Sequence, residues 1–547
     1  MKFLTKYKKE KMKLIKPVLF SAVAATILSS CGSGAEILST PVENIDTVAL
    51  KVSELTENEK HTWGHLDIVK DTIPGMSVDK AYSEIIKDKK GKTVIVAVID
   101  SGIDIEHEDL DGVVWTNKKE IAGNGIDDDK NGYIDDVHGW NFLGDAYDEQ
   151  LEYVRILAKG DTSNPEYARA KAEYDKEYQE TAARKQQYDQ IYQRLKNADE
   201  VISAYLKKDT YTTEEVKAIS TEDEKVTEAV GVLNFIYANG LGTTQEALTA
   251  IKEGVDYFTD KLNYNLNKDF NGRTTGDNPD DLNDVGYGNG NVLPTEIGES
   301  HGTHVAGIIA AERNNGLGAN GVANNVEIMS LRAVPNGDEY DKDIALAIRY
   351  AVDNGAKIIN GSFGKYYSPH SDWVRDAIAY ASDNDVLFIN AAGNEGIDID
   401  SKAVYPNDAV NNGPEVSETF ITVGALAPKY GSNMIASFSN YGKINVDVFA
   451  PGAKVYSTTP ENDYQTKGGT SMAAPAVAGV AALVRSYYPK LTAAQVKQVI
   501  LDSGLAVNQQ VVVGGNASDV RPFADLTKSS KMVNAYNALI MASQLSK

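Results

Sequence analysis

Cysteine is almost absent from this sequence of 547 residues, because only Cys31 is present. The fold therefore cannot depend on an internal disulfide bond. Positive charge is also scarce: 54 Lys and Arg residues oppose 78 Asp and Glu residues, for a formal net charge of −24. Such a chain is a poor partner for nucleic acid, and no nucleic-acid partner is expected. No apolar run is long enough, and free enough of polar residues, to predict a membrane-spanning helix.

The N-terminal segment has the pattern of an export signal. Seven lysines precede residue 17, and an apolar stretch from Pro17 to Leu28 follows. It ends in LSSCG (28–32), which resembles the lipobox of bacterial lipoproteins, where the cysteine is lipidated and becomes the new N-terminus. We expect residues 1–31 to be a lipoprotein signal and 32–62 a tether. The protein would then be exported and held by Cys31 on a bacterial membrane, on its periplasmic face or at the cell surface. An ordinary cleaved secretory signal is the alternative.

Apolar β-branched runs alternate with helical patterns through most of the chain. Runs typical of buried parallel strands occupy 93–99, 326–331, 357–360, 386–390 and 420–423, and helical patterns occupy 341–354 and 371–384. This alternation predicts an α/β fold in which helices cover both faces of a mostly parallel sheet.

One region, 146–265, interrupts the alternation with few strand signals. Residues 165–206 carry a stripe with the spacing of one helix face, namely Tyr167, Tyr174, Tyr188, Leu195 and Ile202, with Tyr178, Tyr192 and Leu206 beside it. Further helical patterns cover 222–237 and 245–262. We predict a helical insertion between two parts of one α/β domain, 63–145 and 266–547. The tyrosine stripe needs a partner, either the returning helices, which we favour, or another subunit.

Three short motifs carry the candidate chemistry. Asp100 follows a strand in VIDSGI (98–103), and open α/β sheets place reactive groups at the carboxyl ends of their strands. His301 begins a predicted helix in ESHGTHVAG (299–307). Ser471 lies in GGTSMAAP (468–475), at the start of a helix whose free N–H groups favour negative charge.

Each motif alone has a plainer interpretation. Asp and Ser are common helix and turn caps. His301 and His304, three residues apart, share a helix face and form an alternative metal pair. The chain offers no cysteine ligand beyond Cys31 and no HExxH pattern, which makes the metal the weaker alternative.

The three motifs together resemble the signature segments of the subtilisin-like serine proteases, the subtilase family. Their order of Asp, His and Ser is that of the family and differs from the orders in chymotrypsin and the α/β-hydrolases. The resemblance covers about 63–146 and 265–547. It implies a three-layer α/β domain and a serine endopeptidase that acts on proteins or peptides. The triad would be Asp100, His301 and Ser471, with no cofactor needed for catalysis.

Two further segments resemble the same family. NAAGNEG (390–396) resembles its oxyanion-hole segment, which implies that Asn394 donates a side-chain N–H to the oxyanion. NGSFG (360–364) resembles the segment beside its specificity pocket. This implies that Ser362, Phe363 and Gly364 bind extended substrate as an added strand.

An acidic segment, NGIDDDKNGYIDD (124–136), resembles the start of an EF-hand-type calcium loop. The predicted ligands of a structural Ca²⁺ ion are Asp127, Asp129, Asn131, the carbonyl of Tyr133, and Asp135 or Asp136. The twelfth position holds His138 where a bidentate Glu is expected, so Asp136 is our choice for the last ligand. A solvated acidic turn is the alternative.

Two other functions remain to be weighed against a protease. A lipoprotein on an inactive protease scaffold would use the insertion as its working part, but it would not need all of Asp100, His301, Asn394 and Ser471. An esterase would use the same triad, and casein compared with an ester dye would separate the two. The insertion carries no residue that peptide hydrolysis needs. We therefore expect that replacing 146–265 with a Gly/Ser linker leaves small-peptide cleavage largely intact.

Overall fold

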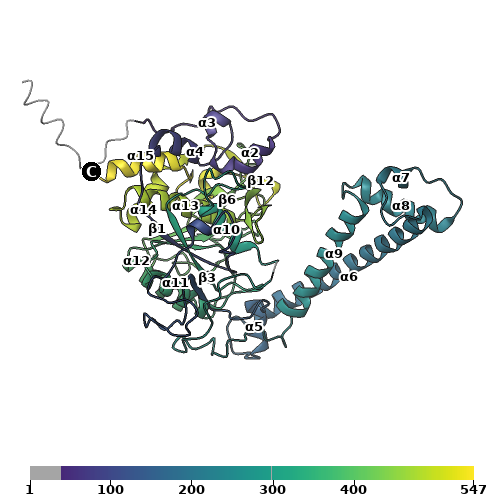
Figure 1. The fold of residues 1–547 in the computed structure, drawn as a ribbon, viewed down its shortest axis with the longest axis horizontal. Coiled ribbons are helices and arrows are strands. Elements are labelled where there is room, and N and C mark those ends of the chain that lie inside the picture. The colour runs from purple at the N-terminus through teal and green to yellow at the C-terminus, as the bar shows by residue number, and fades with distance from the viewer. Residues whose placement is uncertain (1–38, 297) are drawn as a thin grey trace, which may run out of the picture.

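The computed structural model describes residues 39–296 and 298–547 (Figure 1). Its centre is a nine-stranded sheet with the order β10-β13-β7-β6-β5-β4-β1-β3-β2. Every neighbouring pair is parallel except β10 with β13. The strands are β1 (Val94–Asp100), β2 (Gly139–Asn141), β3 (Val326–Arg332), β4 (Ile358–Gly361), β5 (Leu387–Ala391), β6 (Phe420–Leu426), β7 (Val448–Pro451), β10 (Leu505–Ala506) and β13 (Lys531–Met532).

Two hydrophobic cores, one on each face of the sheet, explain why these strands are apolar throughout. Val96 and Val98 of β1 belong to the core under α10 (His301–Ala310), α13 (Thr470–Tyr487), α14 (Ala493–Ser503) and α15 (Ala535–Leu545). Ala97 and Ile99 belong to the core under α11 (Asp341–Asp353) and α12 (Ser371–Asp383). Alternate residues of one strand thus enter opposite layers. The predicted three-layer α/β fold is confirmed.

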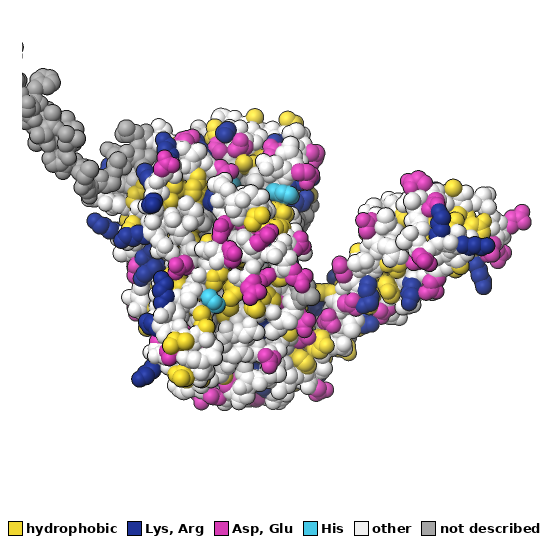
Figure 2. Space-filling view, viewed as in Figure 1, with side chains coloured by type: hydrophobic (Ala, Val, Ile, Leu, Met, Phe, Trp, Pro, Cys, Tyr) yellow, Lys and Arg dark blue, Asp and Glu magenta, His cyan; other side chains and the backbone are white. Residues whose placement is uncertain are grey.

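An arm of helices projects from this domain (Figure 1). It consists of α5 (Glu152–Ala158), α6 (Tyr167–Leu206), α7 (Thr213–Lys217), α8 (Glu224–Ala238), α9 (Thr244–Asp260) and the π-helical turn η4 (Lys261–Asn265). The arm leaves and returns at one place, because the Leu151 N–H donates to the carbonyl of Asn265 at 3.1 Å. Figure 2 shows acidic and basic side chains mixed along its surface.

The arm has its own core, which buries the aliphatic part of the stripe and partly covers several of its tyrosines. Leu195 and Ile202 of α6 are buried against Leu233 of α8 and Ile251 of α9, with Tyr188 at the edge. Nearer the sheet, Tyr167 and Tyr174 pack in a second small core with residues of α5. The returning helices therefore cover the far part of the stripe, and α5 covers Tyr167 and Tyr174, whereas Tyr178 remains 42% exposed.

The N-terminal part of the described chain already packs against the α/β domain within the predicted tether. Ile45 is 1% exposed in the core that contains Trp63. The amide N–H and the carbonyl of Val42 each bond to the Asn537 side chain at 2.8 Å. The predicted tether over 32–62 is thus wrong from Val42 onward, because Val42 is bonded to Asn537 and Ile45 is inserted into a core. Cys31 lies outside the described residues.

Shorter elements complete the fold. They are α2 (Glu57–Thr62), η1 (Trp63–His65), α3 (Ile68–Asp71), α4 (Val78–Lys80), η2 (Ala81–Ile86), η3 (Asp111–Val113), β8 (Val455–Thr459), β9 (Asp463–Lys467), β11 (Gln510–Val513), β12 (Asn516–Pro522) and η5 (Phe523–Asp525). Strands β8 and β9 form an antiparallel hairpin, as do β11 and β12. Among the described helices, none combines the length and apolarity that crossing a membrane requires.

Candidate active site

The candidate residues meet at the carboxyl edge of the sheet. Asp100 is the last residue of β1, Ser362 follows β4, and Asn394 lies three residues beyond β5. These strands are neighbours in the order β5-β4-β1. Parallel strands end at the same edge, so side chains that are far apart in the chain are brought together there.

Asp100 and His301 form a close pair. His301 is the first residue of α10, and its Nδ1 lies 2.7 Å from Oδ1 of Asp100. A carboxylate only accepts hydrogen bonds, so Nδ1 carries the proton and Nε2 is free to act as a base. The next residue, Gly302, permits this approach, because a Cβ atom there would lie 2.2 Å from the carbonyl oxygen of Gly102.

The electrostatics of the pair favour a charged imidazole. Burial opposes protonation of His301, but the Asp100 carboxylate outweighs it and raises the histidine pKa above its usual 6.5. The Asp100 side chain is 2% exposed, whereas that of His301 is 38% exposed. The imidazole is thus open to the cleft while the carboxylate beneath it is sealed. This is the environment that a general base held by a buried anion requires.

Ser471 is the second residue of α13, and an unusual proline shapes its surroundings. Pro475 has no N–H to donate to the carbonyl of Ser471 four residues earlier. The Ser362 hydroxyl donates to that carbonyl instead, at 2.9 Å. In return, the Ser471 hydroxyl donates to the Ser362 carbonyl at 3.1 Å. The candidate nucleophile and the candidate substrate segment are therefore joined by two hydrogen bonds of opposite direction.

Asn394 is oriented by Thr470, a residue that the sequence analysis did not single out. The Thr470 amide N–H and hydroxyl both donate to Asn394 Oδ1, at 2.8 and 3.0 Å. The same hydroxyl accepts the N–H of Gly393 at 3.0 Å. Because two donors occupy its side-chain oxygen, Asn394 has its amide N–H₂ group available to donate to a ligand in the cleft. The signal lay inside the GGTSMAAP motif, directly before the serine.

The candidate catalytic residues all line one cavity of about 430 Å³, namely Asp100, His301, Asn394 and Ser471. Ser362, Phe363 and Gly364 line it too, and so do Gly337 and Glu339 from the segment after β3. His304 does not belong to this cavity: its ring is buried, and Nε2 lies 3.0 Å from the Gln465 carbonyl of β9. Burial lowers the pKa of His304 to about 3. The alternative metal pair with His301 thus has no support in the geometry.

The acidic loop brings together only part of the predicted calcium ligands. Asp127 and Asp129 lie close to Glu120, with one carboxylate oxygen of each residue within 4.8 Å of the others. Asn131 uses its side-chain oxygen to accept the N–H of Tyr133 at 2.8 Å. Asp135 accepts the N–H groups of Asn124 and Gly125 instead, at 3.1 and 2.9 Å.

The last predicted ligand, Asp136, is fully buried beside other donors. It accepts the Tyr350 hydroxyl at 2.6 Å and the Asn131 and Asn117 amides at 2.8 and 2.9 Å. His138 Nδ1 lies 2.8 Å from the carbonyl oxygen of Trp115. The acidic cluster therefore includes Glu120, which the motif could not identify because this residue precedes the loop.

The fold and the site define the class: an α/β protein in which a serine at a helix start, a histidine held by a buried aspartate and an asparagine side chain surround one cleft. The sequence model of the subtilase family matches residues 91–521. The chain belongs to the subtilase family, as the predicted resemblance implied.

Three curated relatives illustrate the similarity. The chain is 39% identical over 246 residues to the thermophilic serine proteinase of Bacillus sp. (strain AK1), covering 45% of this chain and 53% of that protein. It is 37% identical over 201 residues to subtilisin DY of Bacillus licheniformis, covering 37% and 68%. It is 37% identical over 190 residues to thermitase of Thermoactinomyces vulgaris, covering 35% and 62%. The aligned region thus spans about half to two thirds of these relatives.

Proposed function

We propose that the protein is a serine endopeptidase that hydrolyses peptide bonds in proteins through an acyl-enzyme. The observation that carries the proposal is the 2.7 Å contact between His301 and the buried Asp100, in the same cavity as Ser471. The relatives named as serine proteinase, subtilisin and thermitase support the same reaction.

The roles follow from the contacts. Ser471 rotates away from the Ser362 carbonyl and attacks the scissile carbonyl carbon, while Nε2 of His301 takes its proton. Asp100 holds the imidazole in the required tautomer and stabilises the imidazolium. The Asn394 amide and the Ser471 N–H donate to the developing oxyanion. The imidazolium then gives its proton to the leaving amine, and water repeats the sequence to release the acyl group.

The test is a fluorophosphonate, which labels an activated serine, together with casein digestion. We expect the wild-type protein to react and to digest casein. Ser471→Ala should fold, take up no label and leave casein intact. Digestion of casein by Ser471→Ala would contradict the assignment. Hydrolysis of an ester dye without any digestion of casein would favour an esterase.

A structural Ca²⁺ ion is the proposed ligand of the acidic cluster, with Glu120, Asp127 and Asp129 as carboxylate ligands. Calcium prefers six to eight oxygen ligands. The Glu120 Oε2 atom is buried and has no hydrogen-bond donor among the described residues, so a cation beside it would supply the partner that a buried oxygen needs. Glu120 would supply, from before the loop, the carboxylate that the twelfth position lacks.

Melting curves with calcium and with a chelator test this site. A ligand of the folded state raises the melting temperature by mass action, so we expect calcium to stabilise the wild-type protein. Asp129→Ala should remove the difference between the two conditions. Glu418→Ala, which removes an exposed carboxylate elsewhere, is the control and should keep it. Equal melting temperatures for wild type in both conditions would contradict the proposal.

Export and lipid anchoring through Cys31 complete the proposal. Their support is the sequence order of lysines, apolar stretch and LSSCG. The protein would then act on protein or peptide substrates while attached to a bacterial membrane by its N-terminus.

A further inference from the structure

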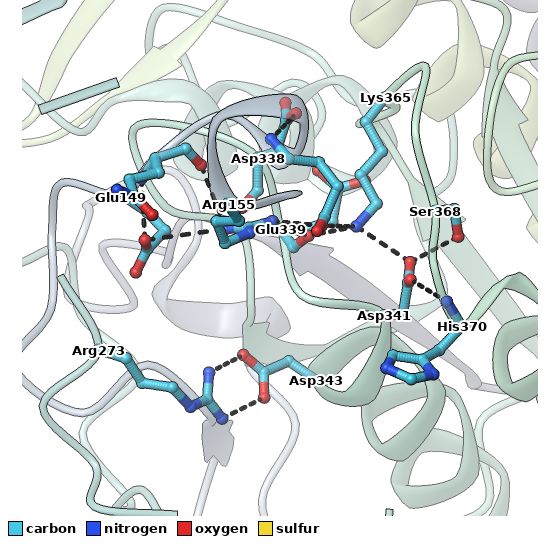
Figure 3. Close-up of polar contacts among 12 residues, drawn as sticks. Glu149, Arg155, Arg273, Asp338, Glu339, Asp341, Asp343, Lys365, Ser368 and His370 are labelled. Atoms are coloured by element: carbon cyan, nitrogen blue, oxygen red, sulfur yellow. Dashed lines mark hydrogen bonds and ion pairs between the residues drawn. The ribbon is translucent and has the colours of Figure 1, made fainter. Parts of the chain in front are cut away.

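The first helix of the arm, α5, packs behind two segments that line the cleft, 337–339 and 362–364. Glu152 and Arg155 are each 6% exposed. Both belong to a buried set of charged residues that also includes Lys365, Glu339 and Asp341, with the half-buried Asp338 beside it (Figure 3). Charged side chains are rarely buried unless they are paired, so such a set fixes the elements that carry it.

Lys365 ties together three parts of the molecule. It directly follows Gly364, which lines the cavity. Its Nζ atom lies 2.8 Å from Glu152 Oε2 on α5, 2.7 Å from the Glu339 carbonyl and 3.0 Å from Asp341 Oδ1. An ammonium group has three N–H donors, and each of the three has a partner here. The group is therefore fixed in position rather than free to adjust.

Arg155 joins α5 to the cleft segment that contains Asp338 and Glu339. Its guanidinium donates to the Asp338 carbonyl at 2.8 Å, to the Glu339 carbonyl at 3.1 Å and to Glu152 Oε2 at 2.6 Å. The Asp338 carboxylate in turn accepts the N–H of Glu152, the first residue of α5, at 2.7 Å. Glu152 thus lies between two cations, each of which also binds the Glu339 carbonyl.

The chain that returns from the arm contacts residues 338–343 at their other end. Arg273, beyond the arm, donates two hydrogen bonds to Asp343, both of 2.9 Å. Its guanidinium carbon lies 4.6 Å from the ring centre of Tyr340, and that of Arg155 lies 4.0 Å from the same centre. Outgoing and returning ends of the excursion therefore both hold residues 338–343.

We propose that α5 is a positioning element of the substrate cleft and that Glu152 is its central residue. The inference rests on the proposed peptidase function. Glu339 and Gly364 line the cleft, and the Glu152–Lys365 and Arg155 contacts fix the distance between the two segments that carry them. An extended peptide pairs with backbone groups along such segments, so their spacing controls how well it binds. Glu152 does not touch the reacting atoms.

Substrates of two lengths separate positioning from chemistry. In Glu152→Ala, we expect KM for a tetrapeptide anilide to rise by roughly tenfold or more, because small displacements of positioning groups are costly. The rate of fluorophosphonate labelling at Ser471 and kcat for a single-residue ester should stay within about twofold of wild type. Glu180→Ala, an exposed change on α6, is the matched control and should change neither.

A second variant keeps the test decisive if Glu152→Ala does not fold. The pair Glu152→Met with Lys365→Met removes one negative and one positive charge together at similar length, which buried charges tolerate better than the loss of a single one, while Arg155 keeps its bonds to the Asp338 and Glu339 carbonyls. We expect this variant to fold and still show the raised KM, because the Glu339 carbonyl has lost its Lys365 donor. A wild-type KM for the tetrapeptide in this variant would overturn the inference, as would an equal loss on both substrates. Failure of the wild-type protein to be labelled would instead overturn the proposed function.

Discussion

At the scale of single residues, the site depends on neighbours that hold the reactive groups. His301 is fixed by Asp100, Asn394 by Thr470, and Ser471 by the exchange of hydrogen bonds with Ser362. Each partner is contributed by a different element, so no local rule of helix or strand formation places them. The positions of the reactive groups in the cleft therefore depend on the whole sheet edge, because the edge brings these segments together.

The pH dependence of activity should report the Asp100–His301 pair. His301 must be neutral to accept the serine proton, and its pKa lies above 6.5 because of Asp100. We therefore expect kcat/KM to fall as the pH drops through a midpoint above 6.5. Asp100→Asn removes the carboxylate but keeps the burial that lowers the pKa, so the midpoint should move to lower pH. By analogy with other triads, kcat should drop about 10⁴-fold.

The measurement is kcat/KM for a peptide substrate from pH 5 to pH 9. His107→Gln serves as the control because His107 is buried and bonds to the Asp463 carbonyl, outside the cleft. A midpoint that stays unchanged in Asp100→Asn would contradict the assignment of the acid limb to His301.

The residues of the motifs were predictable from the sequence, whereas the residues that hold them in place were not. Asp100, His301, Asn394 and Ser471 each lie in a short motif whose chemistry can be read locally. Glu152 and Lys365 are separated by 213 positions and belong to no motif. Glu120 escaped notice for a related reason: it precedes the calcium-like loop, and only the folded chain returns it to Asp127 and Asp129.

At the scale of elements, the sequence patterns located the central strands and the long helices well. The predicted helix over 165–206 corresponds to α6, and the strand runs correspond to β1, β3, β4, β5 and β6. Short strands such as β2 and β10 were missed, because three or two residues carry no periodicity. The early packing around Ile45 was missed as well, since one buried residue in a polar stretch leaves no pattern.

The contacts of α5 divide the insertion into two parts with different expected effects. Replacing 192–250 by a short Gly/Ser linker removes the end of the arm but keeps α5 and the base of α6. We expect this variant to cleave small peptides like wild type. Replacing all of 146–265 leaves Lys365 without Glu152 and the Glu339 carbonyl without Arg155. The expectation that this larger replacement is neutral is therefore revised: KM for extended peptides should rise.

Both variants need circular dichroism and thermal melting to show that they fold. Steady-state kinetics on a tetrapeptide anilide is the measurement. Loss of peptide cleavage in the folded 192–250 variant would show that the far end of the arm also organises the cleft. Wild-type kinetics in the folded 146–265 variant would remove any role for α5.

At the scale of the whole molecule, attachment to a membrane is the property that the N-terminus predicts. Cys31→Ala removes the only cysteine of the chain. We expect the wild-type protein to sediment with membranes and the variant to appear in the soluble fraction, because a lipid chain needs the cysteine. Fractionation followed by blotting is the measurement. Ser30→Ala is the control and should remain with the membranes, whereas sedimentation of Cys31→Ala with membranes would contradict lipidation.

The long arm bears on how copies of the proposed peptidase would act on one another. A peptidase that binds an extended chain as an added strand can cleave exposed extended segments of neighbouring copies. The 40 residues of α6, about 60 Å of helix, keep their backbone groups paired internally and offer no such segment. Capping boxes at Thr212 and Thr243 hold the starts of α7 and α9 against fraying. Within the arm, a peptidase of this kind would find extended backbone only in the short turns between the helices. After a cut there, α6, α8 and α9 would stay together because they share one core.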